Sequence, residues 1–317
     1  MSNEVIVYLL SEWILYILLL IAFLATPRLL YRWNFDHFTS EQFSLENRSY
    51  LIMTIIFFVM TLKIFLLPYF VYTIDILSDL VPGAMCGAGI IQANEYGNPL
   101  LLLKIMILFL SGFWMTINRL DLRAKDYPFT KKKSWFFIAI FILLTVEIGL
   151  DILYFTSIET SQPVTCCSVI FGETGGANAI PMGLDTSKLL LLFYLLYLLI
   201  ILTAVSQYPL GIILSNILFL FVAYYAVVYF FGTYVYELPT HKCPFCMLQS
   251  SYYYIGYLVW SLLLLGVFLG IDYSMVKLLF HQESDRLKWI SLLLLTLFVL
   301  ICTSYVAIYY LKTGVLL

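Results

Sequence analysis

Charged residues are scarce in this chain. Only 11% of its 317 residues are Asp, Glu, Lys or Arg, and 62% are hydrophobic. Soluble domains carry about 25% charged residues, so the composition predicts an integral membrane protein. No charged, Pro-rich or Ser-rich stretch is long enough to serve as a linker. We therefore expect a single polytopic transmembrane domain over residues 1–317 and no soluble domain.

Several functional motifs are also lacking. The sequence contains no Walker, Rossmann or zinc-protease motif, and no predicted span carries a His pair placed for haem ligation. No basic face suggests nucleic-acid binding. The chain opens with Met-Ser-Asn-Glu rather than with basic residues, so the first apolar run is interpreted as a retained helix and not as a signal peptide.

Long apolar runs dominate what is present. A helix needs about 20 apolar residues to cross the hydrocarbon core, and only closed backbone hydrogen bonding is stable in lipid. The predicted fold is an all-α bundle of eight transmembrane helices, at about residues 6–26, 51–72, 100–118, 135–156, 189–206, 210–235, 247–271 and 289–311. The fifth and sixth spans are joined by a tight turn at 207–209.

The basic residues predict the orientation of these spans. Twelve of them fall in segments 27–50, 119–134 and 272–288, against three (Lys188, Lys242 and Lys312) in the opposite segments. We therefore expect both termini and loops 73–99, 157–188 and 236–246 to be extracytoplasmic. The expected location is the plasma membrane, with the lipid bilayer as the main environment.

The three outward loops carry five of the six cysteines: Cys86, Cys166, Cys167, Cys243 and Cys246. Outward loops lie in an oxidising compartment, where disulfides form and persist. Five thiols cannot all pair within one chain, so one is left for a mixed disulfide, a metal ion or a partner. Cys302 falls within the last span, where a packing role is expected.

Cys243-Pro244-Phe245-Cys246 precedes an apolar run. Proline is favoured at the first position of a helix, which would place Cys243 at the N-cap and Cys246 one turn inside. The positive helix end, together with the accessory residues His241 and Lys242, would then favour a thiolate at Cys243. A thiolate is the nucleophile in disulfide exchange and also a soft metal ligand.

This motif locally resembles the Cys-Pro-x-Cys of thioredoxin-like proteins. In a membrane setting it is similar to that of quinone-linked disulfide-generating enzymes, including the vitamin K epoxide reductase family. In those enzymes a Cys-x-x-Cys opens a transmembrane helix and loop cysteines pass electrons to it. The resemblance covers about a dozen residues, and the family is built on about four spans, against eight here. It implies a quinone cofactor and an extracytoplasmic thiol-redox partner.

Three functions stay open from the sequence. The first is thiol–disulfide exchange at Cys243 and Cys246, with Cys86, Cys166 and Cys167 as further catalytic thiols. The second is transport or binding of a soft metal ion by the same cysteines. The third is a non-catalytic membrane subunit stapled by structural disulfides, although a disulfide within Cys-x-x-Cys closes a small loop and restrains the unfolded chain little.

Four charged residues fall inside predicted spans: Lys63, Lys104, Glu147 and Asp151; Glu12 lies near the start of the first span. An unpaired charge at this depth is costly, so each is a candidate functional residue. Lys63 and Glu147 lie at similar depth, and Lys104 is near the level of Asp151. The spacing predicts two ion pairs, which either hold the helices together or line a proton path or polar cavity.

Overall fold

The computed structural model describes residues 2–33, 40–124, 127–159, 163–164, 183–280 and 285–317. Eight helices in these segments are long and apolar enough to cross a membrane, which confirms the predicted fold class. They are α1 (Asn3–Arg32), α2 (Ser40–Leu77), α4 (Gly97–Arg123), α5 (Thr130–Thr156), α7 (Thr186–Ser206), α8 (Pro209–Ala226) continued by η2 (Val227–Phe231) and α9 (Gly232–Tyr236), α10 (Ile255–Phe280) and α11 (Asp285–Thr313). The side of the membrane that each terminus faces stays a prediction.

Side-chain caps mark the starts of two of the long helices. The Ser2 hydroxyl accepts a hydrogen bond from the Val5 N–H at the start of α1, and the Asp185 carboxylate accepts one from the Thr186 N–H at the start of α7. Gln207, in the left-handed conformation at φ 54°, ends α7, and Pro209 begins α8. The tight turn expected between these two spans is therefore present.

The predicted start of the seventh span was wrong. Cys246–Leu248 and Ser250–Tyr252 form two short 3₁₀ turns, η3 and η4, and the transmembrane helix α10 begins only at Ile255. Tyr253 and Tyr254 have φ values of 53° and 55°. This left-handed conformation interrupts right-handed helical structure, so the chain reaches α10 through a break and not as one helix.

The described chain divides into two compact units. The amino-terminal unit comprises Met1–Leu80 and Ile90–Gln162, and the carboxy-terminal unit comprises Val81–Gly89 and Pro163–Leu317. The connection between α2 and α4, which includes the short helix α3 (Gly87–Ile91), thus contributes residues to both units.

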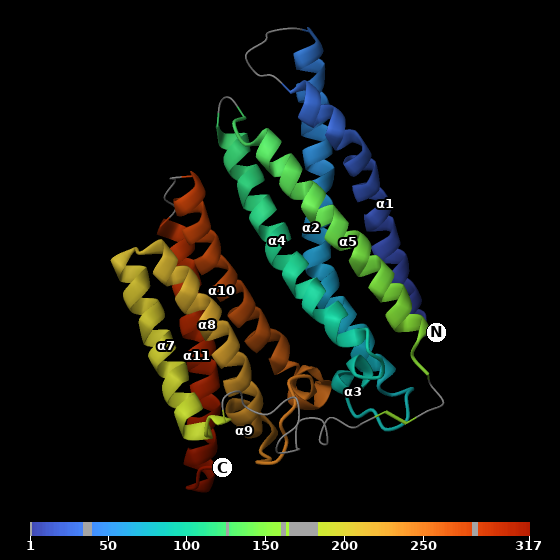
Figure 1. Cartoon of the computed structure of the whole chain (residues 1–317). Helices are drawn as coiled ribbons and strands as arrows, with labels where there is room; N and C mark the ends of the chain where they lie inside the picture. Colours follow the sequence, from blue (N-terminus) through green and yellow to red (C-terminus); the bar gives the residue numbers. More distant parts are fainter. Residues whose placement is uncertain (1, 34–39, 125–126, 160–162, 165–182, 281–284) are drawn as a thin grey trace. The chain divides into compact units, whose positions relative to one another are not determined.

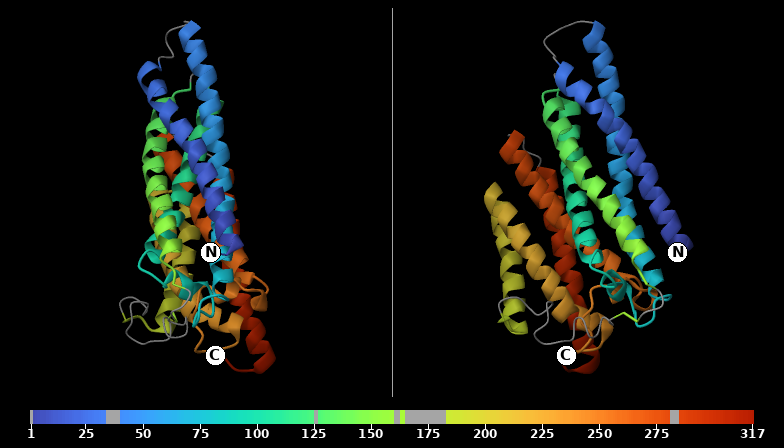
Figure 2. Two further views of the ribbon diagram at one scale, coloured as in Figure 1. Left: turned by 90° about the vertical axis from the view of Figure 1, so that its right-hand side faces the viewer. Right: turned by 45° about the vertical axis from the view of Figure 1, so that its right-hand side comes forward.

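Each unit is a four-helix bundle with the same cyclic order. In the amino-terminal unit α1 packs on α2, α2 on α4, α4 on α5, and α5 on α1 (Figures 1 and 2). In the carboxy-terminal unit α7, α8, α10 and α11 repeat this order. Consecutive helices within each bundle run antiparallel, which gives an up-down-up-down arrangement.

The two bundles have different cores. Leu19, Ile56, Trp114 and Phe137 belong to one apolar cluster in the amino-terminal unit. In the carboxy-terminal unit Phe193 packs against rings of three other helical segments, with centroid separations of 5.2 Å to Phe219, 5.1 Å to Phe231 and 6.2 Å to Phe298. Both cores leave leucine and isoleucine side chains on the outer faces of the helices, as a lipid environment favours.

Candidate functional site

Three cysteines from two distant segments meet in the carboxy-terminal unit. The Sγ atoms of Cys86 and Cys243 lie 3.5 Å apart. With Cys246 they form a set of three buried cysteines whose sulfur atoms all lie within 4.8 Å of one another. A disulfide bond measures about 2.05 Å, so Cys86 and Cys243 are in contact but not bonded to each other. We call these three residues the thiol cluster.

The loop that carries Cys243 and Cys246 is held by aromatic side chains. The buried Tyr236 hydroxyl, at the end of α9, donates a hydrogen bond to the carbonyl oxygen of Cys243 and accepts one from the Met247 N–H at 3.1 Å. The indole N–H of Trp260, on α10, donates to the Pro244 carbonyl at 3.3 Å. Both ends of the Cys-Pro-Phe-Cys turn are therefore fixed by the neighbouring helices.

Hydrogen bonds to its backbone carbonyl groups hold the segment that carries Cys86. The Gln249 side-chain amide donates to the Met85 carbonyl at 3.2 Å, and the Val164 N–H donates to the Pro82 carbonyl at 2.9 Å. Gly83 has φ +83°, and a Cβ there would come within 2.5 Å of the Val164 carbonyl oxygen. Glycine is required at this position for both reasons.

The predicted helix N-cap at Cys243 was wrong. Cys243 lies in irregular backbone and Pro244 in a turn; only the 3₁₀ turn η3 begins at Cys246. No long helix begins at the motif, so the helix-end effect expected to favour a thiolate at Cys243 is not supplied. Instead of a helix end, the structure places the Cys86 thiol next to Cys243.

The two accessory residues lie against aromatic rings. His241 packs on Tyr236, with ring centroids 4.5 Å apart, and its buried Nε2 has no hydrogen-bond partner among the described residues. The Lys242 ammonium lies 5.3 Å from the centroid of the Tyr229 ring. These contacts place both side chains beside the turn, while a direct role at the sulfur atoms stays a prediction.

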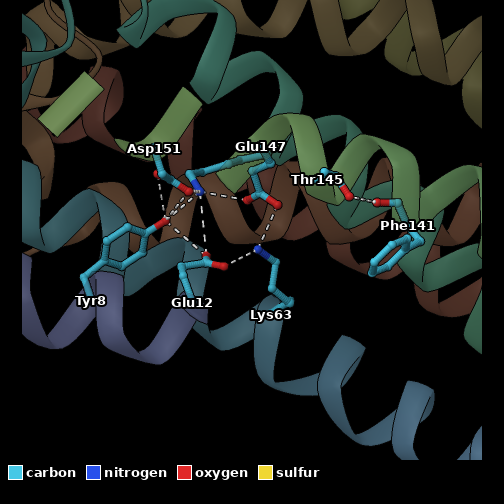
Figure 3. A network of polar contacts seen from close by, with 8 residues as sticks. Tyr8, Glu12, Lys63, Phe141, Thr145, Glu147 and Asp151 are labelled. Carbon is cyan, nitrogen blue, oxygen red and sulfur yellow. Dashed lines mark hydrogen bonds and ion pairs between the residues drawn. The ribbon is translucent and has the colours of Figure 1, made fainter. Parts of the chain in front are cut away.

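A second candidate site, a cluster of charged side chains, lies inside the amino-terminal unit (Figure 3). Both expected ion pairs are present, since Lys63 Nζ lies 2.8 Å from Glu147 and Lys104 Nζ lies 2.8 Å from Asp151. Lys63 also contacts Glu12 at 2.6 Å, and Lys104 also contacts Glu147 at 2.7 Å. We call the connected set the charge network; it contains Tyr8, Glu12, Lys63, Lys104, Glu147 and Asp151.

Tyr8 is the member of the charge network that sequence analysis missed. Its side chain is fully buried, and its hydroxyl accepts a hydrogen bond from Lys104 at 2.6 Å. The same oxygen lies 3.1 Å from Glu12 and 3.2 Å from Asp151. One signal was available, because Tyr8 precedes Glu12 by one helical turn and so shares its helix face.

Cys166 and Cys167 lie outside the described residues, so their proposed catalytic role stays a prediction. Cys302 is buried in α11.

Tyr236 and Trp260 were not recognised from the sequence, because each lies in an aromatic-rich stretch where nothing distinguishes it from its neighbours. Cys86 was predicted as one of three possible exchange partners of Cys243, with Cys166 and Cys167; its contact with Cys243, 157 positions away, comes from the structure.

Comparisons with protein-family models, with curated proteins and with solved structures found no match to this chain.

Proposed function

We propose that this multi-pass membrane protein carries out thiol–disulfide exchange at the thiol cluster. The observation that carries the proposal is the contact between Cys86 and Cys243, 3.5 Å apart, with Cys246 in the same buried set. A purely structural disulfide needs only two cysteines. With three in one site, any disulfide between two of them leaves the third in place to attack it.

The exchange step follows from this arrangement. Starting from a Cys243–Cys246 disulfide, the Cys86 thiolate attacks Cys243 Sγ. The Cys86–Cys243 bond forms, the Cys243–Cys246 bond breaks, and Cys246 leaves as a thiolate that takes up the proton released by Cys86. The step conserves oxidation state and moves the disulfide between two pairs that share Cys243.

A full turnover needs an electron donor and an acceptor. A substrate dithiol, on an extracytoplasmic thiol-redox protein, gives two electrons and two protons to the cluster disulfide and becomes a disulfide itself. A membrane quinone then takes the same two electrons and two protons and becomes a quinol, which restores the cluster disulfide. The bilayer setting supports this choice of acceptor, as does the resemblance of the Cys-Pro-Phe-Cys sequence to that of quinone-linked enzymes; the helix that opens at the motif in those enzymes is replaced here by the short turn η3.

We further propose that Cys166 and Cys167 exchange with the cluster. Val164 is hydrogen-bonded to Pro82, in the segment that carries Cys86, and Cys166 follows Val164 by two residues.

The test uses cysteine variants in membranes, quenched with acid and separated by non-reducing electrophoresis, followed by mass spectrometry. We expect Cys246→Ser to accumulate a Cys86–Cys243 disulfide, because the competing thiol is gone. Cys243→Ser should accumulate neither cluster disulfide, and Cys302→Ser should behave as wild type. The proposal fails if Cys246→Ser gives no disulfide through Cys243 and the wild-type cluster also resists strong reductant.

A second function is favoured by the same geometry. Three sulfur atoms within 4.8 Å of one another can supply a thiolate ligand set of the kind that selects Cu(I). Metal analysis of the purified protein separates the two functions. Stoichiometric copper that is lost in both Cys86→Ser and Cys246→Ser would replace the exchange proposal with soft-metal binding or transport.

A further inference from the structure

The charge network contains more negative than positive groups. Glu12, Glu147 and Asp151 contribute three carboxyl groups, and Lys63 and Lys104 contribute two ammonium groups. The carboxyls come from α1 and α5, and the lysines from α2 and α4. Among the described residues no further charged side chain contacts this set. With every group ionised, the network carries one uncompensated negative charge.

The surroundings make that charge costly. The side chains of the five charged residues are between 1% and 9% exposed, and all five lie in helices that cross the membrane. An isolated charge in a medium of low polarity is strongly unfavourable, and the group normally becomes neutral instead. Charge balance therefore calls for one proton on the three carboxyl groups.

The hydrogen bonds indicate where this proton resides. Glu147 accepts from Lys104 at one oxygen (2.7 Å) and from Lys63 at the other (2.8 Å), so both of its oxygens are compensated by ammonium groups. Asp151 has one lysine, Lys104 at Oδ2 (2.8 Å), and its Oδ1 lies beside the Tyr8 hydroxyl. Glu12 Oε2 is paired with Lys63 at 2.6 Å, while Oε1, beside the Tyr8 hydroxyl, has only the longer contact with Lys104 at 3.7 Å. The proton belongs on the Glu12–Tyr8–Asp151 side.

A small cavity adjoins the same groups. Its volume is about 20 Å³, enough for one water molecule, and its polar lining comes from Tyr8, Glu12, Lys63, Lys104, Ser111 and Glu147. A water there would have several hydrogen-bond partners, which a buried water requires.

We propose that the charge network is an intramembrane proton-binding site that holds one exchangeable proton between Asp151 and Glu12, with Tyr8 as the relay. When Asp151 is protonated it donates to the Tyr8 oxygen, and Tyr8 donates its own proton to Glu12. Transfer along this line gives the Asp151 proton to Tyr8 and the Tyr8 proton to Glu12. The negative charge moves from Glu12 to Asp151, and no atom is gained or lost. This proposal does not rest on the function proposed for the thiol cluster.

Infrared spectroscopy tests the proton directly. We expect the wild-type protein in lipid nanodiscs at neutral pH to show the C=O stretch of a protonated carboxyl group, with the shift that exchange into D₂O produces. Exposed carboxyls are ionised at this pH and do not contribute. Asp151→Asn, Glu12→Gln and Glu147→Gln should each abolish the band, because two carboxylates then balance two lysines. Glu41→Gln, at an exposed position of α2, is the matched control and should keep it.

Two further variants test the charge count. Lys63→Met leaves three carboxyls beside one lysine, so the band should increase as a second proton is taken up. Glu12→Gln combined with Asp151→Asn leaves one carboxylate beside two lysines, and its loss of thermal stability should exceed the sum of the two single losses. Absence of the band in folded wild-type protein overturns the proposal, as does a band that persists in all three single amide variants.

Discussion

Tyr236 holds in place the turn that carries Cys243 and Cys246. Its hydroxyl connects the Cys243 carbonyl and the Met247 N–H across the Cys-Pro-Phe-Cys turn. Its ring also packs against His241 and Tyr252 at centroid distances of 4.5 Å and 4.8 Å. The end of α9 is thus tied to the loop that carries two of the three cluster sulfurs.

Tyr236→Phe should remove both hydrogen bonds while keeping the ring. A buried backbone group left without a partner costs about 1–3 kcal/mol, so we expect a lower thermal midpoint in detergent. We also expect faster alkylation of Cys243 by a maleimide, because the loop is less restrained. Tyr253→Phe is the control, since Tyr253 is 92% exposed. Equal effects of the two substitutions would contradict the positioning role of Tyr236.

The contact between Lys63 and Glu147 can be measured with a double-mutant cycle. Lys63→Met and Glu147→Gln each leave charged partners in a buried network, whereas the double variant removes the pair together. Contacting residues typically show coupling of about 0.5–3 kcal/mol. We expect the double variant to lose less stability than the two single losses added. Strict additivity of the three unfolding free energies would argue against the pair.

At the scale of the element, hydropathy predicted the existence of the helices better than their ends. A window of apolar residues identifies the part of a helix within the hydrocarbon core, but α2 continues through polar residues from Ser40, although its predicted span starts at 51. Backbone hydrogen bonds favour continuation of the helix beyond the hydrocarbon core, and a hydropathy window does not detect this polar part of the helix. The reverse error occurred at α10, where the left-handed Tyr253 and Tyr254 have no sequence signature.

Close helix packing around α10 depends on small residues. A Cβ on Gly270 would lie 2.9 Å from Asn216 Nδ2 and 2.9 Å from Ser291 Oγ, both of them buried. Gly270→Ala should therefore destabilise the carboxy-terminal bundle by about 1–3 kcal/mol, seen as a lower thermal midpoint. Gly149→Ala in α5 meets nothing within 4 Å and should be neutral or stabilising, since alanine favours helix over glycine. A neutral Gly270→Ala would show that α8 and α11 can move apart without cost.

At the scale of the whole molecule, sequence reasoning could find the members of each site but only part of their arrangement. Counting residues from the helix ends predicted the pairs Lys63–Glu147 and Lys104–Asp151, because depth in a membrane is a single coordinate. The meeting of Cys86 with Cys243 depends on how an irregular loop folds back onto a bundle. The periodicity of the sequence does not predict the conformation of such a loop. The thiol cluster could therefore be identified only from the structure.

The orientation in the membrane is the remaining prediction from the basic residues. Twelve lysines and arginines in one set of connecting segments, against three in the other, predict that both termini lie outside the cytoplasm. We expect cysteines introduced at Asn3 and Val315, both exposed, to react with an impermeant maleimide in intact cells more strongly than the wild-type chain does. A cysteine at the exposed Lys132 should react only after the membrane is permeabilised. Labelling at Lys132 in intact cells would reverse the topology and move the thiol cluster to the reducing side, where stable disulfides are rare and the exchange proposal would lose its oxidising compartment.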